Sequence, residues 1–392
     1  MLKLCTTGRS SLAIAVGLAV GIASVGCSDE TNSDMSAAAT TGAGASTSTG
    51  ATGAGGSTLS TARLRRRDLV SDEAGAAQRD ADLVNPWGVA FDPDALTGAS
   101  FWVADNHSGV ATIYDASGDK SSLVVTIPAI AGETTSAPTG QVYNGSPHFK
   151  GDRFIFDSED GTIVGWSSGT QAVVRVDRSA GHASYKGLAI ATSGAPRLYA
   201  TDFRRDGVEM FDGDYALMSV EDAFRDDSIP AGFAPFNVAF IDDRVYVTYA
   251  MQDADKADDQ PGPGNGYIDV FDADGALVKR LASRGVLNSP WAMAKAPTGF
   301  GSLSGALLVG NFGDGRIHAF DIETGELKGA VLNTAGAPLV IDGLWTLTFG
   351  PGSELVPIPA RPTSDLRSTL FFTAGPGDES HGRFGKLELV AP

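Results

Sequence analysis

The sequence has little sulfur, little positive charge and no long hydrophobic run after its first residues. Its 392 residues include two cysteines, Cys5 and Cys27, and both precede the part with a globular composition. This excludes a disulfide-stapled scaffold, a cysteine nucleophile and a thiolate metal site in that part. Lysine and arginine number 29 against 47 acidic residues, a formal net charge of −18. So acidic a chain argues against a nucleic-acid partner. After the first residues, no apolar run approaches the roughly 20 residues of a membrane helix.

The first 26 residues have the pattern of a secretory signal. Lys3 and Arg9 precede an apolar stretch at residues 12–22, and small residues then lead to Cys27. Residues 24–27 (SVGC) resemble a bacterial lipobox, in which the cysteine is acylated and becomes the mature N-terminus. The alternative is signal cleavage nearby that leaves an unmodified thiol. We expect residues 1–26 to be a lipoprotein signal peptide and the protein to reside in the cell envelope, at the outer membrane, either periplasmic or surface-exposed.

A second segment, residues 27–62, consists mostly of Ser, Thr, Gly and Ala. Such a composition buries too little apolar surface to offset the entropy of ordering the chain. We therefore expect a disordered, flexible tether that begins at the lipidated Cys27. The folded domain is predicted to occupy residues 63–392.

One sequence motif recurs six times in the folded domain, at intervals of 47 to 55 residues. It is a short apolar strand that starts with Pro, Tyr or Leu and has Gly, Asn, Ala or Thr at its third position. The six copies are residues 86–91, 138–143, 185–190, 235–240, 290–295 and 344–349. A repeat of this length fits the four strands of a propeller blade, and each blade buries its faces only against its neighbours. No segment shows a sustained helical period. The sequence therefore predicts an all-β fold, a six-bladed β-propeller.

The sixth copy lacks a fourth strand, because the chain ends soon after its third strand at residues 385–390. Residues 66–71, directly after the tether, have a strand-like sequence that could complete this blade. An N-terminal strand would then close the ring on the last blade and remove an exposed sheet edge.

The repeat resembles the NHL family of six-bladed propellers, whose relatives include gluconolactonase and strictosidine-synthase-like enzymes. Residues 69–72 (LVSD), 83–88 (LVNPWG) and 101–106 (FWVADN) more closely resemble a bacterial family of secreted propeller proteins of unassigned function. This resemblance covers nearly all of residues 68–390. It implies the propeller fold and says little about activity.

Polar residues recur at the end of the second strand of each blade. By repeat position they form a ring of Asp105, Asp157, Asp202, Tyr249, Asn311 and Ala374. Oxygen ligands that converge from several blades suit Ca²⁺ or another divalent cation, so Asp105, Asp157, Asp202 and Asn311 are candidate metal ligands. The alternative is that each Asp caps the turn after its own strand. The lactonase relatives bind a divalent ion in their channel, but the Glu of their first blade has no counterpart here.

Loops that enter the innermost strands and loops that join strands two and three share one face of a propeller. The candidate ligand-binding residues on that face are Asn85, Trp87, His107, Asn288, Trp291, Trp345 and His381. The three tryptophans share one repeat position and could line a groove, or they could pack between blades. His107 and His381 lie on equivalent loops and could bind a metal or act as a base, or they could have no role.

These observations favour a lipid-anchored, extracytoplasmic propeller that binds a protein, a peptide or a glycan. The domain is expected to be a monomer. The alternative is a divalent-metal-dependent hydrolase of the lactonase type, with its site at the mouth of the central channel. Fold analogy alone supports both hypotheses, since a fold does not determine a function.

Overall fold

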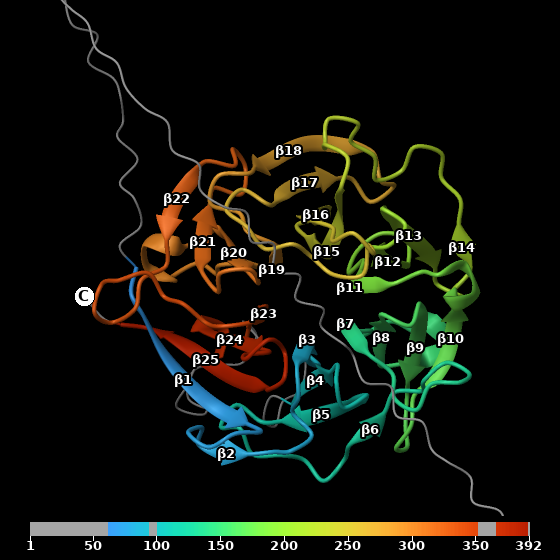
Figure 1. Ribbon diagram of the computed structural model, residues 1–392, viewed down its shortest axis with the longest axis horizontal. Coiled ribbons are helices and arrows are strands. Elements are labelled where there is room, and N and C mark those ends of the chain that lie inside the picture. Colours follow the sequence, from blue (N-terminus) through green and yellow to red (C-terminus); the bar gives the residue numbers. More distant parts are fainter. Residues whose placement is uncertain (1–61, 94–99, 352–365, 391–392) are drawn as a thin grey trace, which may run out of the picture. The chain divides into compact units, whose positions relative to one another are not determined.

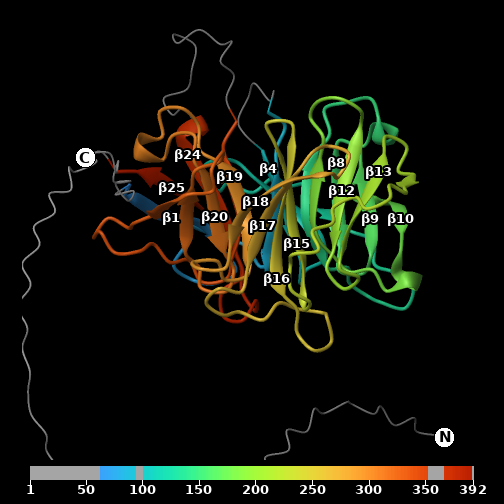
Figure 2. The same cartoon turned by 90° about the horizontal axis from the view of Figure 1, so that it is seen from above.

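The computed structural model describes residues 62–93, 100–351 and 366–390, which belong to one compact unit. Six sheets, antiparallel except for one short parallel pair, stand in a ring around a central channel, with the innermost strand of each sheet at the centre (Figure 1). Strands cross the thickness of the ring, so the connecting loops gather on its two faces (Figure 2). This confirms the predicted six-bladed β-propeller. No helix in the described ranges is long and apolar enough to cross a membrane.

Each of the first three blades follows the chain from the channel to the rim. Blade 1 comprises β3 (Pro86–Ala90), β4 (Phe101–Asp105), β5 (Val110–Tyr114) and β6 (Val125–Thr126). Blade 2 comprises β7 (Pro138–Tyr143), β8 (Phe154–Ser158), β9 (Thr162–Trp166) and β10 (Val173–Asp177). Blade 3 comprises β11 (Tyr185–Ile190), β12 (Arg197–Asp202), β13 (Gly207–Asp212) and β14 (Leu217–Met218).

The other three blades complete the ring. Blade 4 comprises β15 (Phe233–Ile241), β16 (Arg244–Met251), β17 (Tyr267–Phe271) and β18 (Leu277–Ser283). Blade 5 comprises β19 (Pro290–Lys295), β20 (Leu307–Asn311), β21 (Ile317–Phe320) and β22 (Leu327–Ala330). Blade 6 comprises β23 (Leu344–Phe349), β24 (Thr369–Ala374), β25 (Arg383–Leu389), β1 (Leu64–Ser71) and β2 (Gln78–Arg79). Short 3₁₀ turns are η1 (Phe149–Gly151), η2 (Ser179–Gly181), η3 (Gly301–Leu303) and η5 (Leu366–Ser368).

The N-terminal strand closes the ring as the sequence predicts. β1 pairs antiparallel with β25, from Leu64 opposite Leu389 to Ser71 opposite Arg383. β1 starts two residues earlier than expected, and β2 extends the sheet by a short parallel pairing with β1. The closing strand thus covers the edge that β25 would otherwise expose to solvent.

Apolar residues between neighbouring blades form the core. Each of the six blade interfaces has its own cluster of buried hydrophobic side chains. Between blades 1 and 2, for example, Trp102 stacks on Phe154 with ring centroids 4.1 Å apart. A seventh cluster, rich in tryptophan, occupies the channel itself. The fold therefore has no single core and depends on closure of the ring to bury the faces of every blade.

The inner strands approach each other closely near the channel axis. A Cβ atom on Gly88 would lie 2.6 Å from the carbonyl oxygen of Thr139, and one on Gly140 would lie 2.3 Å from the backbone nitrogen of Leu188. Every inner strand also has an irregular register near its third residue. Small residues at the third position are therefore a steric requirement of the ring, as the repeat pattern indicated.

Candidate functional site

The second residues of the inner strands close one end of the channel. Trp87 and Trp345 stack with their centroids 3.5 Å apart and an interplanar angle of 19°. Trp291 packs edge-on against both, at 5.9 and 5.7 Å. The three side chains are only 1–4% exposed. They form a buried plug in the channel, where the rings pack against one another and not along an open groove.

Two hydrogen bonds fix the orientation of the plug. Trp345 donates from Nε1 to Oδ1 of Asn85 at 2.9 Å, and Trp291 donates from Nε1 to the Lys186 carbonyl at 2.9 Å. Asn85 is itself fully buried and adopts a φ of 47°, a left-handed conformation that asparagine tolerates better than most residues. Asn85 was predicted to contact a ligand. In the structure it is buried and holds Trp345 of the plug in place.

Lys186 occupies the position in blade 3 that Trp87, Trp291 and Trp345 occupy in their blades. Its side chain is 1% exposed, and its ammonium lies over the rings of Trp87 and Phe203, at 5.4 and 5.9 Å from their centroids. A buried ammonium needs a counter-ion. Two acids supply it: Glu159 forms a short ion pair with Lys186, and Asp258 lies 3.1 Å from Nζ.

Amide side chains extend this ion pair across the channel mouth. Asn106 donates from Nδ2 to Oε2 of Glu159 at 3.0 Å. Asn85 donates from Nδ2 to Oε2 of Glu379 at 2.5 Å and lies 3.4 Å from Oδ1 of Asn106. We call the six residues Asn85, Asn106, Glu159, Lys186, Asp258 and Glu379 the mouth network. Blades 1, 2, 3, 4 and 6 all contribute to it, so it forms only in the closed ring.

The electrostatics of the mouth network show a shortage of positive charge. Burial, and then the nearby charge of Glu159, raise the pKa of Glu379 to about 7. Burial opposes ionisation of Glu159, but the Lys186 ammonium outweighs it and holds the pKa of Glu159 below its ordinary value. Beside Asp258, burial raises the pKa of Asp259 to about 6. Lys186 therefore pairs with Glu159 and Asp258 but leaves Glu379 and Asp259 poorly compensated, and perturbed acids in a concave site often mark function.

The predicted metal ligands have other partners. Asp105 accepts hydrogen bonds from the backbone nitrogen and Oγ1 of Thr112. Asp202 accepts from the backbone nitrogens of Ser184 and Arg205, both at 3.1 Å. Each carboxylate thus bonds within its own blade, but only the Arg205 nitrogen lies in the turn after the strand, where the capping interpretation expects a donor.

The other two candidates also have hydrogen-bond partners, on the inner strand or in the loop that leads to it. Asp157 accepts from Thr139 Oγ1 at 2.9 Å and from the Gly140 nitrogen at 2.5 Å. Asn311 donates to the Val286 carbonyl and accepts from the Asn288 nitrogen. Among the described residues, no group of three or more His, Cys, Asp or Glu side chains is arranged to hold a metal ion. The divalent-cation site therefore stays a prediction that no cluster of ligands supports.

The structure corrects the repeat alignment in blade 2. Pro86 pairs with Asp105 and Tyr185 with Asp202, but Pro138 pairs with Ser158. Ser158 is therefore the counterpart of Asp105, and Asp157 lies one residue earlier on the strand. Because adjacent strand residues point to opposite faces, this shift removes Asp157 from the predicted ring.

The remaining predicted residues do not converge. His107 is exposed, whereas His381 contacts Asp72 at 2.9 Å from Nδ1 and Glu73 at 3.4 Å from Nε2. Hydrogen bonding to Asp72 raises the pKa of His381, and this contact joins the segment after β1 to the loop before β25. Asn288 accepts from the Gly262 nitrogen at 2.7 Å and so fixes the long insertion of blade 4. The two histidines therefore have separate surroundings.

Sequence reasoning missed most of the mouth network. One available signal was Lys186, a charged residue at a repeat position that is otherwise aromatic or Thr. Glu159 and Glu379 follow the second strands of blades 2 and 6 at unequal distances, so repeat alignment does not bring them together. Residues 1–26, Cys27 and the tether through residue 61 lie outside the described residues, and their predicted roles stay predictions.

No model of a known protein family matches the chain. The chain is 36% identical over 294 residues to uncharacterized protein R648 of Acanthamoeba polyphaga mimivirus, covering 70% of this chain and 71% of that protein. It is 36% identical over 288 residues to uncharacterized protein L690 of the same virus, covering 69% of this chain and 74% of that protein. These relatives are viral, so the resemblance to a bacterial secreted family stays a prediction.

Two solved structures share the fold at low sequence identity. An inactive variant of virginiamycin B lyase from Staphylococcus aureus, with quinupristin, aligns with a TM-score of 0.50 at 12% identity, over 84% of this chain and all of that chain. A protein of unknown function from Bacteroides thetaiotaomicron aligns with a TM-score of 0.52 at 12% identity, over 83% of this chain and 76% of that chain. At such identities the likeness shows the six-bladed fold alone.

Proposed function

This chain belongs to the same family as the mimivirus proteins R648 and L690, and we propose that it is a binding module whose mouth network captures a cationic group of a protein, peptide or glycan. The observation that carries this proposal is the surplus of carboxylates around Lys186. Glu159 and Asp258 already flank that single ammonium, and Glu379 and Asp259 carry raised pKa values beside them.

A bound cation would relieve this repulsion. An amine or guanidinium close to Glu379 favours its ionised form, so ionisation of Glu379 and binding of the cation stabilise each other. The site is also reachable, since the Asp258 side chain is 72% exposed and that of Glu159 is 27% exposed. The plug beneath prevents deep entry into the channel. The fitting ligand is therefore a positively charged group presented from a larger partner.

The proposed setting follows from the sequence alone. Acylation at Cys27 would anchor the chain at the outer membrane, and residues 28–62 would allow the propeller to reach partners some distance away. A rigid ring on a flexible tether suits capture better than it suits chemistry. The same setting would suit a member of a bacterial family of secreted propellers.

The test is calorimetric binding of a tetralysine peptide, with tetraglutamate as the charge-reversed control, at pH 6 and pH 8. Glu379 has a pKa of about 7, so its charge, and with it the affinity for tetralysine, should rise between these pH values. Glu379→Gln should weaken binding and flatten this pH dependence. Asp255→Asn removes the same charge from an exposed position on the blade 4 insertion and should change little.

Two other outcomes would contradict capture of a cation by the mouth network. Equal effects of Glu379→Gln and Asp255→Asn would mean that binding reflects net charge and not the mouth network. About one equivalent of a bound divalent ion, with a thermal midpoint that falls in EDTA, would instead favour the metal-dependent hydrolase of the lactonase type.

A further inference from the structure

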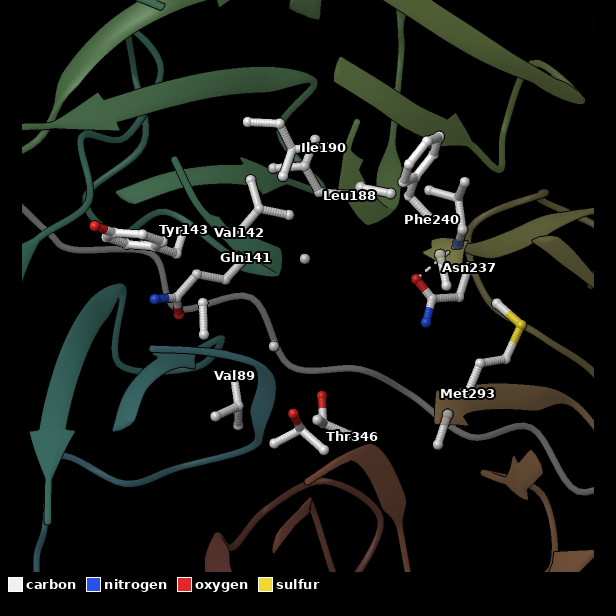
Figure 3. A pocket seen from close by; sticks show the side chains of 18 of the residues that line it. Val89, Gln141, Val142, Tyr143, Leu188, Ile190, Asn237, Phe240, Met293 and Thr346 are labelled. Atoms are coloured by element: carbon white, nitrogen blue, oxygen red, sulfur yellow. Dashed lines mark hydrogen bonds between the residues drawn. The ribbon is translucent and has the colours of Figure 1, made fainter. Parts of the chain in front are cut away.

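A cavity of about 310 Å³ lies in the central channel, on the other side of the tryptophan plug from the mouth network. The inner strands of all six blades surround it (Figure 3). Trp291 of the plug lines its inner end, and Phe91, Tyr143, Thr192 and Phe240 line it where the inner strands reach the opposite face. The cavity therefore opens on the face opposite the mouth network.

Strand edges, not strand faces, are turned towards this cavity. Consecutive side chains of an inner strand pack into the two neighbouring blade interfaces: Leu188 belongs to the cluster between blades 2 and 3, and Ala189 to the cluster between blades 3 and 4. Val238 and Ala239 of blade 4 divide in the same way between the interfaces with blades 3 and 5. Each inner strand is also the last strand of its sheet, so its free edge faces the axis.

The strand register identifies which backbone groups face the axis. In an antiparallel pair, residues that exchange hydrogen bonds with the partner strand alternate with residues whose N–H and C=O groups point away from it. In blade 3, the Ala191 nitrogen donates to the Arg197 carbonyl at 2.9 Å, and the register continues without a shift back to Leu188. Leu188, three residues earlier, therefore turns its N–H and C=O groups away from β12 and towards the axis.

The same alternation applies in other blades. In blades 2, 5 and 6 it assigns the axis-facing groups to Gln141, Met293 and Leu347. In blade 4 the donor is already satisfied, because the Val238 nitrogen donates to Oδ1 of Asn237 at 2.8 Å. The backbone bonds that fix the alternation in blades 2, 5 and 6 lie three residues further along, from Asn144, Ala296 and Gly350 to the carbonyls of Arg153, Ala306 and Thr369.

Glycine leaves two of these donors uncovered. A Cβ atom on Gly88 would lie 2.8 Å from the Gln141 nitrogen, and one on Gly140 would lie 2.3 Å from the Leu188 nitrogen. Among the described residues, neither nitrogen donates to a side chain or to a loop carbonyl. Glycine at these positions therefore keeps the N–H groups of Gln141 and Leu188 open to a ligand.

The lining is polar but uncharged. More of its exposed surface is polar than apolar, and none of the described residues around it is Asp, Glu, Lys, Arg or His. A charged ligand would lose its hydration without gaining a counter-ion, and an apolar one would leave the axis-facing peptide groups unpaired. Side-chain amides do not meet the ligand: Asn237 is bonded to the Trp291 carbonyl at 2.7 Å, and the Gln141 carboxamide is directed away from the centre of the cavity (Figure 3).

We propose that this cavity binds a small neutral polyol of about the size of a monosaccharide. A hydroxyl group both donates and accepts, so a ring of hydroxyls can pair with N–H and C=O groups that reach it from several blades. The volume lies at the lower end of the range for small-molecule sites, which suits a single ring. At the entrance, the partly exposed Phe91, Tyr143 and Phe240 offer aromatic surface to the C–H groups of that ring. The site is separate from the proposed cation site, so either can fail without the other.

Three ring-shaped probes test the chemistry. myo-Inositol carries a hydroxyl on every ring carbon, cyclohexanol carries a single one, and glucuronate adds a charge to a sugar ring. Binding to the full chain is measured by ligand-observed NMR with titration, and the position is read from crystals soaked in myo-inositol. We expect myo-inositol to bind best, cyclohexanol about tenfold more weakly, in line with the loss of one or two buried hydrogen bonds, and glucuronate not at all.

Two substitutions locate the binding. Thr192 is exposed and lines the entrance, so Thr192→Trp should obstruct it and weaken the binding of myo-inositol by about tenfold. Thr324→Trp is the matched control: it makes the same exchange at an exposed turn between β21 and β22, outside the lining, and should leave binding unchanged. Equal affinity for myo-inositol and cyclohexanol in the natural protein would overturn the proposal. So would equal effects of the two variants, or a soaked crystal in which the cavity holds only ordered water.

Discussion

Lys186 stands where blades 1, 5 and 6 carry tryptophan, and its removal has a predictable cost in stability. Replacing it by methionine keeps the length of the side chain but leaves the Glu159 carboxylate without its counter-ion. Breaking a buried pair from one side costs about 3–5 kcal/mol, and the exposed part of Glu159 places the expected loss at the lower end. We expect Lys186→Met to lower the free energy of unfolding in urea by about 3 kcal/mol at pH 7.

The sign of the pH dependence follows from Glu159. In the natural protein its pKa is lowered, so the pair stabilises the fold above the unfolded pKa and loses that contribution as the pH falls. The difference between Lys186→Met and the natural protein should therefore shrink towards pH 4. The double variant Lys186→Met/Glu159→Gln should recover part of the loss. A loss that stays constant from pH 4 to pH 7 would show that packing, and not the charge, accounts for the effect.

Two buried glutamines provide a matched pair. Gln252 donates from Nε2 to the Phe203 carbonyl at 2.6 Å, whereas Gln141 has no partner among the described residues. Gln252→Leu should lower the free energy of unfolding by about 1–3 kcal/mol, because it leaves a buried carbonyl unpaired. Gln141→Leu should be neutral or stabilising. Equal losses in denaturant unfolding of the two variants would contradict the assignment of Gln141 as unsatisfied.

At the residue scale, sequence reasoning succeeded where a repeat position determines the environment. The shared position of Trp87, Trp291 and Trp345 predicted that they would come together, and they do. It failed for Asp157, because a single-residue register shift in β7–β8 is invisible in a pattern of apolar residues. The apolar pattern of a strand looks the same after a shift of one residue, whereas the pairing of the strands and the face of each side chain change.

The ring depends on one element, the strand β1 that closes it. β1 contributes a full row of pairing to β25, and two further contacts join its end to the blade: Ser71 donates from Oγ to the Gly382 carbonyl at 2.8 Å, and Arg383 contacts Asp68 at 3.0 Å. Without β1, the edge of β25 would be free to pair with another chain.

A shortened chain tests this dependence. A protein that starts at residue 72 should have a lower thermal midpoint than one that starts at residue 62, and it should associate at concentrations where the longer one is monomeric. Thermal unfolding and light scattering measure the two effects. Matching midpoints and masses for the two proteins would show that blade 6 is stable with three strands.

The existence of β1 could be predicted because the last copy of the repeat lacked a strand and a strand-like segment followed the tether. β2 could not, since Gln78–Arg79 is too short to give a period. Asp72, which directly follows the closing strand, also contacts His381. The prediction that His107 and His381 act at one site did not anticipate this contact.

For the whole molecule, the period of the repeat was enough to predict six blades and their order around the channel. The mouth network was beyond such reasoning. Asn85 and Glu379 are 294 residues apart in the chain, and their contact depends on closure of blade 6 beside blade 1. The cavity on the other side of the plug is equally a property of the ring, since every blade contributes one wall.

The pairing of β1 with β25 also dictates an order of events in synthesis. Asp68 and Arg383, which meet in the finished blade, are 315 residues apart, so β1 leaves the ribosome long before its partner is made. Contacts so distant in the chain are slow to form. Until the last blade emerges from the ribosome, the nascent chain can form the earlier blades. It cannot close the ring, because β1 has no β25 to pair with. Closure of the ring is therefore a late event: it cannot begin before β25 has been synthesised, however early the first five blades form.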